Sequence, residues 1–122
     1  MYVKDLEKTY QFYHSKLGFP LISRVEGRHV FFNAGKSVLL CFIAEATAVD
    51  ETLPPHHGSG NLHLAFEVEP SDYEPTKEKL VHLGIEITHE QTWKESLKSF
   101  YFNDPDGHVL EIVPIGLWKD KV

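Results

Sequence analysis

Apolar residues recur at helical spacing in two separate stretches of the chain. The first stretch follows Asp5, a residue favoured at helix N-caps, and stops at Gly18. The second follows Ser71, which forms a capping-box pattern with Glu74, and stops at Gly84. The sequence therefore predicts one helix in each half of the chain.

Runs of alternating apolar and polar residues, rich in β-branched and aromatic types, predict the strands. These runs cover residues 21–25, 29–33 and 38–43 in the first half, and 61–68, 86–89, 99–103 and 108–113 in the second. Short segments containing Gly, Asp or Pro separate several of them and predict turns. Each helix is thus followed by three strands, and a strand also precedes the second helix.

The two halves of the chain repeat one another. A common offset of 66 residues relates the helix starts Asp5 and Ser71 and the helix stops Gly18 and Gly84. The sequence predicts a single α+β domain over residues 1–122, built from two βαβββ modules that form a paired, partly open β-sheet cleft. Module one covers residues 1–44, the linker 45–60 and module two 61–122.

The opening strand of module one is predicted to be truncated. Alignment of Val3 with Val68 places the equivalent of His63 before Met1, so the first strand retains only its last residues.

Composition narrows the classes of function. The chain has 122 residues and a formal net charge of −6, and its arginines are Arg24 and Arg28, so no basic stripe is available to bind nucleic acid. No apolar run approaches the roughly 20 residues that a membrane span requires. The lone Cys41 excludes a disulfide within the chain, which is compatible with a cytoplasmic protein.

Glu111 is the most informative candidate residue. Alternation along residues 108–113 places it between Val109 and Val113 on an otherwise apolar face. A carboxylate in that position costs several kcal/mol unless a cation, a hydrogen-bond partner or a metal ion compensates it. His63, on the predicted strand 61–68, is a candidate partner; the alternatives are a core histidine or a direct hydrogen-bonded pair with Glu111.

Other side chains are weaker candidates. Tyr101 shares a face with Asn103, where its hydroxyl could orient a substrate oxygen. His56 or His57, in the proline-rich linker, could contact substrate, whereas His108 is expected to be exposed to solvent. Four large aromatic residues either wall an apolar pocket or belong to the core: Phe32, Phe42, Trp93 and Trp118.

Several segments together resemble the vicinal-oxygen-chelate superfamily, which includes glyoxalase I, fosfomycin-resistance thiol transferases, extradiol dioxygenases and bleomycin-resistance proteins. The resemblance is carried by residues 3–8, 12–13, 17–19, 61–66 and 104–111. It implies that His63 and Glu111 bind a divalent metal ion of the Mn, Fe, Zn, Ni or Co type. Leu40, at the module-one position that matches Glu111, weakens the resemblance to glyoxalase I. The other histidine of the His, His, Glu ligand set belongs to the truncated first strand.

The resemblance implies a metal-dependent enzyme, expected to be homodimeric, that acts on a small molecule through a chelated oxyanion. The reaction would be of isomerase, thiol transferase or dioxygenase type, with Glu111 and Tyr101 as catalytic residues and a third ligand from elsewhere, such as a partner subunit. One alternative is a metal-free protein that sequesters small molecules, as bleomycin-resistance proteins do. Another is an inactive, truncated domain.

Overall fold

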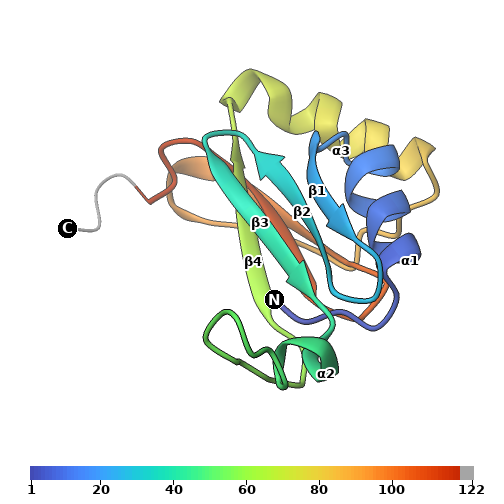
Figure 1. Cartoon of the computed structure of the whole chain (residues 1–122). Coiled ribbons are helices and arrows are strands. Elements are labelled where there is room, and N and C mark those ends of the chain that lie inside the picture. Colours follow the sequence, from blue (N-terminus) through green and yellow to red (C-terminus); the bar gives the residue numbers. More distant parts are fainter. Residues whose placement is uncertain (119–122) are drawn as a thin grey trace. The chain divides into compact units, whose positions relative to one another are not determined.

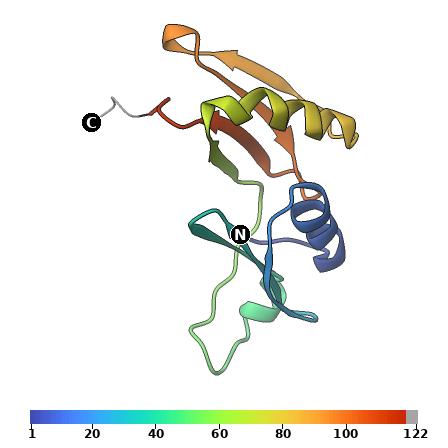
Figure 2. The same ribbon diagram turned by 90° about the horizontal axis from the view of Figure 1, so that it is seen from above.

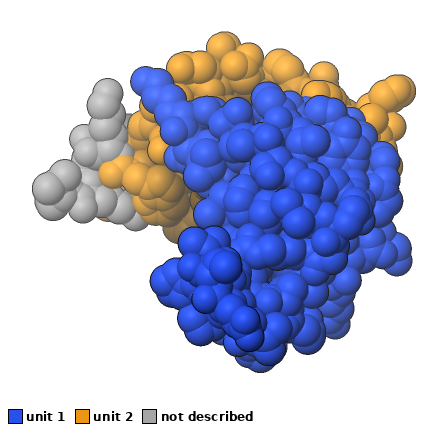
Figure 3. Space-filling view, in the orientation of Figure 1, with its two compact units in different colours: residues 1–62 blue, residues 63–122 orange. Residues whose placement is uncertain are grey.

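The chain forms two compact units, Met1–Leu62 and His63–Val122, coloured separately in Figure 3. The computed structural model describes residues 1–118. Each unit has its own sheet and its own helix, so each is described by itself.

The first unit places a helix beside a three-stranded antiparallel sheet (Figure 1). Its elements are α1 (Leu6–Tyr10), which continues as the π-helix η1 (Gln11–Lys16), then β1 (Leu21–Val25), β2 (His29–Ala34), β3 (Ser37–Phe42) and the short helix α2 (Ala44–Thr47). The strands lie in the order β1-β2-β3.

The ends of the first helix form as the sequence predicts. The Asp5 carboxylate accepts a hydrogen bond of 2.9 Å from the backbone N–H of Lys8, as an N-cap does. Gly18 adopts a φ of 79°, a left-handed conformation that glycine tolerates without a steric cost. The backbone N–H of Leu17 donates to the carbonyl of Phe12, five residues earlier, which is the hydrogen-bond pattern of a π-helix.

The second unit has the complete βαβββ order. Its elements are β4 (His63–Val68), the 3-10 helix η2 (Pro70–Asp72), α3 (Tyr73–His82), β5 (His89–Thr92), the 3-10 helix η3 (Lys94–Ser96), β6 (Lys98–Asn103) and β7 (Val109–Pro114). The sheet order is β4-β7-β6-β5, with β4 parallel to β7 and the remaining neighbours antiparallel.

Helix α3 covers one face of this sheet (Figure 2). Tyr73 of α3 packs its ring 5.4 Å from that of Phe100 on β6, and its hydroxyl donates a 2.7 Å hydrogen bond to Glu90 on β5. Phe100, Phe102, Leu110 and Ile112 are buried on β6 and β7. The alternate residues on the same strands therefore lie on the opposite face of the sheet.

The register explains how the two units correspond. Tyr101 pairs with Glu111 in the second unit, and Phe31 pairs with Leu40 in the first. In the first unit, the opening strand is reduced to a single parallel bridge between Tyr2 and Phe42. This bridge corresponds to the pair Glu67–Val113 in the second unit. Leu40 thus occupies the position of Glu111.

Two local expectations from the sequence are wrong. The strand expected at 86–89 lies instead at His89–Thr92, because a hairpin closed by the Trp93–Leu97 backbone hydrogen bond shifts the pairing toward the turn. Helix α3 begins with Asp72 as its N-cap and has no side-chain cap, since η2 supplies the first turn in place of a capping box at Ser71. The predicted linker, residues 45–60, begins within the short helix α2.

No helix among residues 1–118 combines the length and the apolar character that crossing a membrane requires.

The ion pair between Lys77 and Glu90 generates a stability prediction. Lys77 Nζ lies 2.8 Å from Glu90 Oε1, and both side chains are 26% exposed. The hydrogen bond from Lys77, followed by that from Tyr73, lowers the pKa of Glu90 below its ordinary 4.5, against an opposing effect of burial. The ionised carboxylate therefore stabilises the fold above pH 4.5, and this contribution is lost as the pH falls through the lowered pKa.

We expect Glu90→Gln to reduce the free energy of unfolding by about 1 kcal/mol at pH 7, and by much less near pH 3. Urea unfolding at the two pH values measures this difference. Glu86→Gln, at an exposed position in the preceding loop, is the matched control and should change neither value. An equal loss at both pH values would show that the effect of Glu90 is steric rather than electrostatic.

Candidate metal and substrate site

The face of the second sheet opposite α3 carries the polar candidates. We call it the site face. Its strand residues are His63, Ala65 and Glu67 on β4, Val109, Glu111 and Val113 on β7, Ser99, Tyr101 and Asn103 on β6, and His89 and Gln91 on β5. The expected convergence of His63, Tyr101 and Glu111 depends on this alternation along three neighbouring strands.

His63 and Glu111 are in direct contact. Nε2 of His63 lies 3.0 Å from Oε1 of Glu111, although the residues are 48 positions apart in the chain. The parallel pairing of β4 with β7 brings them together, because His63 pairs with Val109 and Ala65 with Glu111. The imidazole thus leans along the strand toward the carboxylate.

The second nitrogen of His63 fixes the tautomer of the ring. Nδ1 lies 3.0 Å from the carbonyl oxygen of Val109, which can only accept a hydrogen bond, so Nδ1 carries a proton. In a neutral ring, Nε2 then presents a lone pair toward the carboxylate. Two acceptor atoms at 3.0 Å require a proton or a cation between or beside them.

Glu111 is almost completely buried. Its side chain is 4% exposed, against 53% for His63. The other carboxylate oxygen, Oε2, is buried and has no hydrogen-bond partner within the described part of the chain. A buried acceptor without a partner costs about 1–3 kcal/mol, more when the group is charged. The carboxylate is therefore incompletely compensated by His63.

Tyr101 stands beside this pair. It is the cross-strand partner of Glu111, and its ring stacks against that of His63 at a centroid distance of 6.0 Å. On its other side lies the ring of His89, at 5.7 Å. Burial raises the pKa of Tyr101 above its ordinary value of 10, and a hydrogen bond with Glu111 adds to this rise, whereas a hydrogen bond with Ser99 opposes it. The phenol stays protonated and can donate a hydrogen bond.

Ser99 and Trp93 form a contact at the next position along β6. Ser99 is fully buried, and its hydroxyl accepts a 2.9 Å hydrogen bond from Nε1 of Trp93. Because Ser99 points to the site face, this bond brings the indole to the same side. Trp93 in turn packs against Trp118 at 5.7 Å. Both tryptophans were candidates in the sequence analysis, but Ser99 was not. Ser99 lies two residues before Tyr101, and this spacing places the two residues on the same face of the strand.

His56 lies in the first unit, where Tyr2 and Phe42 surround it. Its Nδ1 is 2.8 Å from the hydroxyl of Tyr2, and its ring packs 4.7 Å from that of Phe42. Among the residues whose side chains the structure describes, no group of three His, Cys, Asp or Glu is placed to hold a metal ion. The two candidate ligands that lie in contact are His63 and Glu111.

His108 is buried, contrary to the expectation that it is exposed. The carboxylate of Asp104 accepts hydrogen bonds from the backbone N–H groups of Asp106 and His108, and the backbone N–H of Asp104 donates to the carbonyl of His108. This compact turn extends the β6–β7 pairing by one step and carries the imidazole inside.

The sequence also missed a neutral histidine at His29. Nη1 of Arg28 donates to Nδ1 of His29 at 2.6 Å, which leaves Nε2 protonated and directed to the Ser23 hydroxyl at 3.3 Å. Burial, and then the charge of Arg28, lowers the pKa of His29. Its Nε2 cannot therefore act as a base toward Ser23, and the contact is structural.

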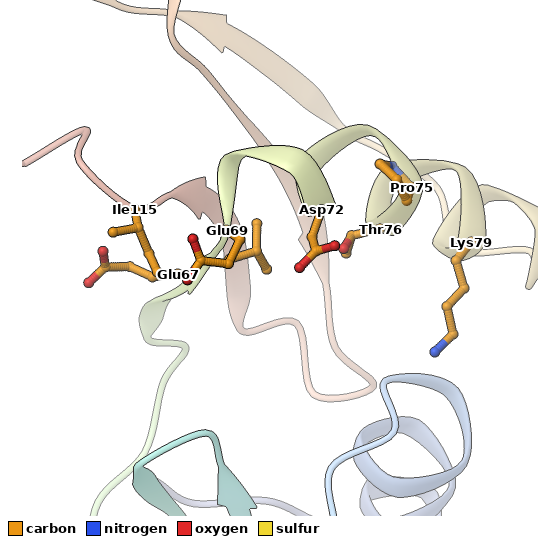
Figure 4. A pocket seen from close by; sticks show the side chains of 8 residues that line it. Glu67, Glu69, Asp72, Pro75, Thr76, Lys79 and Ile115 are labelled. Atoms are coloured by element: carbon orange, nitrogen blue, oxygen red, sulfur yellow. The ribbon is translucent and has the colours of Figure 1, made fainter.

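A pocket of about 490 Å³ lies elsewhere in the second unit, at the end of β4 and the start of α3 (Figure 4). Its lining is Glu67, Val68, Glu69, Asp72, Pro75, Thr76, Lys79 and Ile115. It includes neither His63 nor Glu111, so the candidate metal ligands lie outside it.

Known proteins resemble the chain in sequence. It is 34% identical to "Glutathione transferase FosA" of Serratia marcescens over 116 residues, which cover 90% of this chain and 73% of that protein. It is 31% identical to "Metallothiol transferase FosB" of Lysinibacillus sphaericus, with coverage of 89% and 74%.

The fold matches that of solved structures. A lactoylglutathione lyase from Agrobacterium tumefaciens superposes with a TM-score of 0.89 at 26% identity, covering 97% of this chain and 91% of that one. The family model described as "Glyoxalase/Bleomycin resistance protein/Dioxygenase superfamily" matches residues 1–112, which include His63, Tyr101 and Glu111. The chain therefore belongs to the glyoxalase/bleomycin resistance protein/dioxygenase superfamily, as the sequence resemblance indicated.

Proposed function

We propose that this protein is a divalent-metal-dependent enzyme that acts on a small molecule through a metal-bound oxygen. The observation that carries the proposal is the contact of Nε2 of His63 with Oε1 of Glu111, beside a buried carboxylate oxygen that lacks a partner. A cation would compensate both features at once, because it would bind the lone pair of Nε2 and neutralise the buried charge.

The chemistry and spacing of the two side chains fit a first-row divalent ion. Imidazole nitrogen and carboxylate oxygen suit Mn²⁺, Fe²⁺, Zn²⁺, Ni²⁺ or Co²⁺ without selecting one of them. At metal–ligand distances of about 2.1 Å, two adjacent ligands of an octahedral ion stand about 3.0 Å apart. The observed separation of 3.0 Å between Nε2 and Oε1 matches that spacing.

Two ligands from this unit leave coordination positions for substrate, water or a further side chain. Such open positions distinguish a catalytic metal from a structural one. A third ligand supplied across a homodimer is part of the proposal, since exposed apolar side chains on the first sheet, such as Val38 and Leu40, are suited to contact a second copy.

Thiol transfer is the reaction type we favour. The names of the two relatives described above denote glutathione transfer and metallothiol transfer. In such a step a thiolate sulfur bonds to an electrophilic carbon while a carbon–oxygen bond breaks, and the oxygen takes the electron pair. A metal ion would stabilise the developing oxyanion as a Lewis acid. The Tyr101 hydroxyl, which stays protonated, would donate a hydrogen bond to the same oxygen.

The metal-free binding protein remains the second candidate. Leu40 replaces a carboxylate in the first unit, and the direct His63–Glu111 contact already pairs one oxygen of the carboxylate. A measurement of metal binding distinguishes the metal-dependent enzyme from the metal-free binding protein.

Metal affinity should depend on Glu111. We expect the wild-type protein, purified without affinity tag or chelator, to bind one divalent ion per site, and Glu111→Ala to lose it. At a metal concentration about 100 times the Kd, the free energy of unfolding should rise by about 2.7 kcal/mol in the wild type and remain unchanged in the variant.

Elemental analysis and metal-dependent thermal unfolding measure the two quantities. Glu69→Gln, at an exposed carboxylate after β4, is the matched control and should retain both responses. If the wild type binds no ion, and micromolar additions do not stabilise it, the enzyme proposal fails and the metal-free binding protein takes its place.

Tyr101→Phe should separate catalysis from metal binding. We expect kcat for thiol conjugation of an epoxide to fall by about tenfold to a hundredfold, because one donor to the developing oxyanion is lost. Metal content should stay at the wild-type level. Steady-state kinetics and elemental analysis provide the measurements, and Tyr10→Phe, in the first unit, is the control. A variant that loses metal together with activity would place Tyr101 in support of the ligands instead.

A further inference from the structure

The site face is organised as rows of side chains that cross the four strands. Ala65, Glu111, Tyr101 and His89 form one row, because each pairs with the next across the sheet. We call this the metal row. The pair Glu67–Val113 and the pair Gln91–Ser99 lie one step of two residues along the same strands, and we call them the adjacent row. A substrate bound through oxygen at the metal row must extend its remaining atoms over a neighbouring row or into solvent.

Trp93 covers part of the adjacent row. Its indole N–H is bound to the buried hydroxyl of Ser99, and Ser99 lies two residues before Tyr101 on β6, about 7 Å along the strand. The ring of Trp118 packs edge-on against the indole at a centroid distance of 5.7 Å. The indole thus forms a fixed aromatic wall beside the metal row.

The charges of the site face disfavour an anionic body. None of the strand residues of the site face is Lys or Arg, whereas Glu67 lies in the same row as Ser99. A carboxylate, phosphate or phosphonate that extended over this row would approach the Glu67 carboxylate, and the strands offer it no basic partner; the neighbouring cation, Lys94, belongs to η3. An uncharged aromatic or apolar body would instead gain contact with the indole, which favours stacked or edge-to-face partners.

We propose that Trp93 is a specificity-determining residue, and that the substrate carries its metal-binding oxygens on an uncharged aromatic or apolar body. This inference rests on the proposed function, since it concerns the substrate of the same metal site. Trp93 acts by direct contact with that body, and Ser99 acts through Trp93 by holding the indole in place.

Two probes that bind metals through paired oxygens test the proposal. The first is 4-nitrocatechol, whose oxygens sit on an aromatic ring, and the second is oxalate, which has no such body. In Mn²⁺-loaded protein we expect Trp93→Ala to weaken nitrocatechol binding about tenfold and to leave oxalate binding within twofold of the wild type. Trp93→Phe should retain most of the nitrocatechol affinity, because it keeps an aromatic wall and loses only the N–H.

Trp93→Lys should reverse the preference, since it adds a cation next to the metal row. The absorbance shift of bound nitrocatechol and its competition by oxalate provide the affinities, and thermal unfolding checks that each variant is folded. If Trp93→Ala does not fold, the affinities of Trp93→Phe and Trp93→Lys for the two probes still test the proposal. Equal losses for both probes, or no loss for either, would overturn the assignment of Trp93.

A parallel series with EDTA-treated protein separates this inference from the proposed function. Nitrocatechol should still quench tryptophan fluorescence, more weakly than with metal, and the affinity should still fall in Trp93→Ala. If the wild type binds no metal but its nitrocatechol affinity still depends on Trp93, the proposed metal-dependent enzyme is refuted and the role of Trp93 in contacting the ligand stands. A wild type that binds metal but shows no dependence on Trp93 would refute the wall alone.

Discussion

The burial of one carboxylate constrains the whole second unit. Glu111 lies on β7, which has β4 on one side and β6 on the other, so backbone pairing on both sides holds its position. The carboxylate cannot turn to solvent, and its side chain is 4% exposed. Its compensation must come from neighbouring strands, and His63 supplies part of it. The contact with His63 leaves Oε2 without a hydrogen-bond partner in the described part of the chain, so the carboxylate is only partly compensated.

The parallel pairing of β4 with β7 makes this arrangement possible. A parallel neighbour requires a crossover connection, which α3 provides, and residues far apart in the chain thereby become neighbours across the sheet. The first unit repeats the register but offers Leu40 in place of Glu111, and its parallel contact consists of the single bridge of Tyr2 to Phe42. The same backbone plan therefore carries ionisable chemistry in one unit and an apolar face in the other.

The sequence predicted the features that depend on local rules. The cap at Asp5, the stop at Gly18 and the placement of Glu111 on one face with Val109 and Val113 follow from side-chain chemistry and from the period of two along a strand. The errors arise where tertiary contacts decide. The hairpin moved β5, and the Asp104 turn buried His108, although its neighbours Gly107 and Asp106 are turn residues. The role of Ser99 could not be predicted from the sequence, because it depends on the hydrogen bond from Trp93, which only the structure shows.

The two rows of the site face separate the requirements of chemistry from those of recognition. In the metal row, a change at Glu111 would alter the buried charge that the neighbouring strands must compensate. The adjacent row lies two residues away along each strand, and Trp93 reaches it from a loop rather than from a strand. Substitutions there can change which body is accepted while the strand register and the His63–Glu111 contact persist. This separation gives a physical reason why one sheet architecture can serve different reactions in related proteins, because a side chain in one row can change while the backbone pairing of the strands is kept.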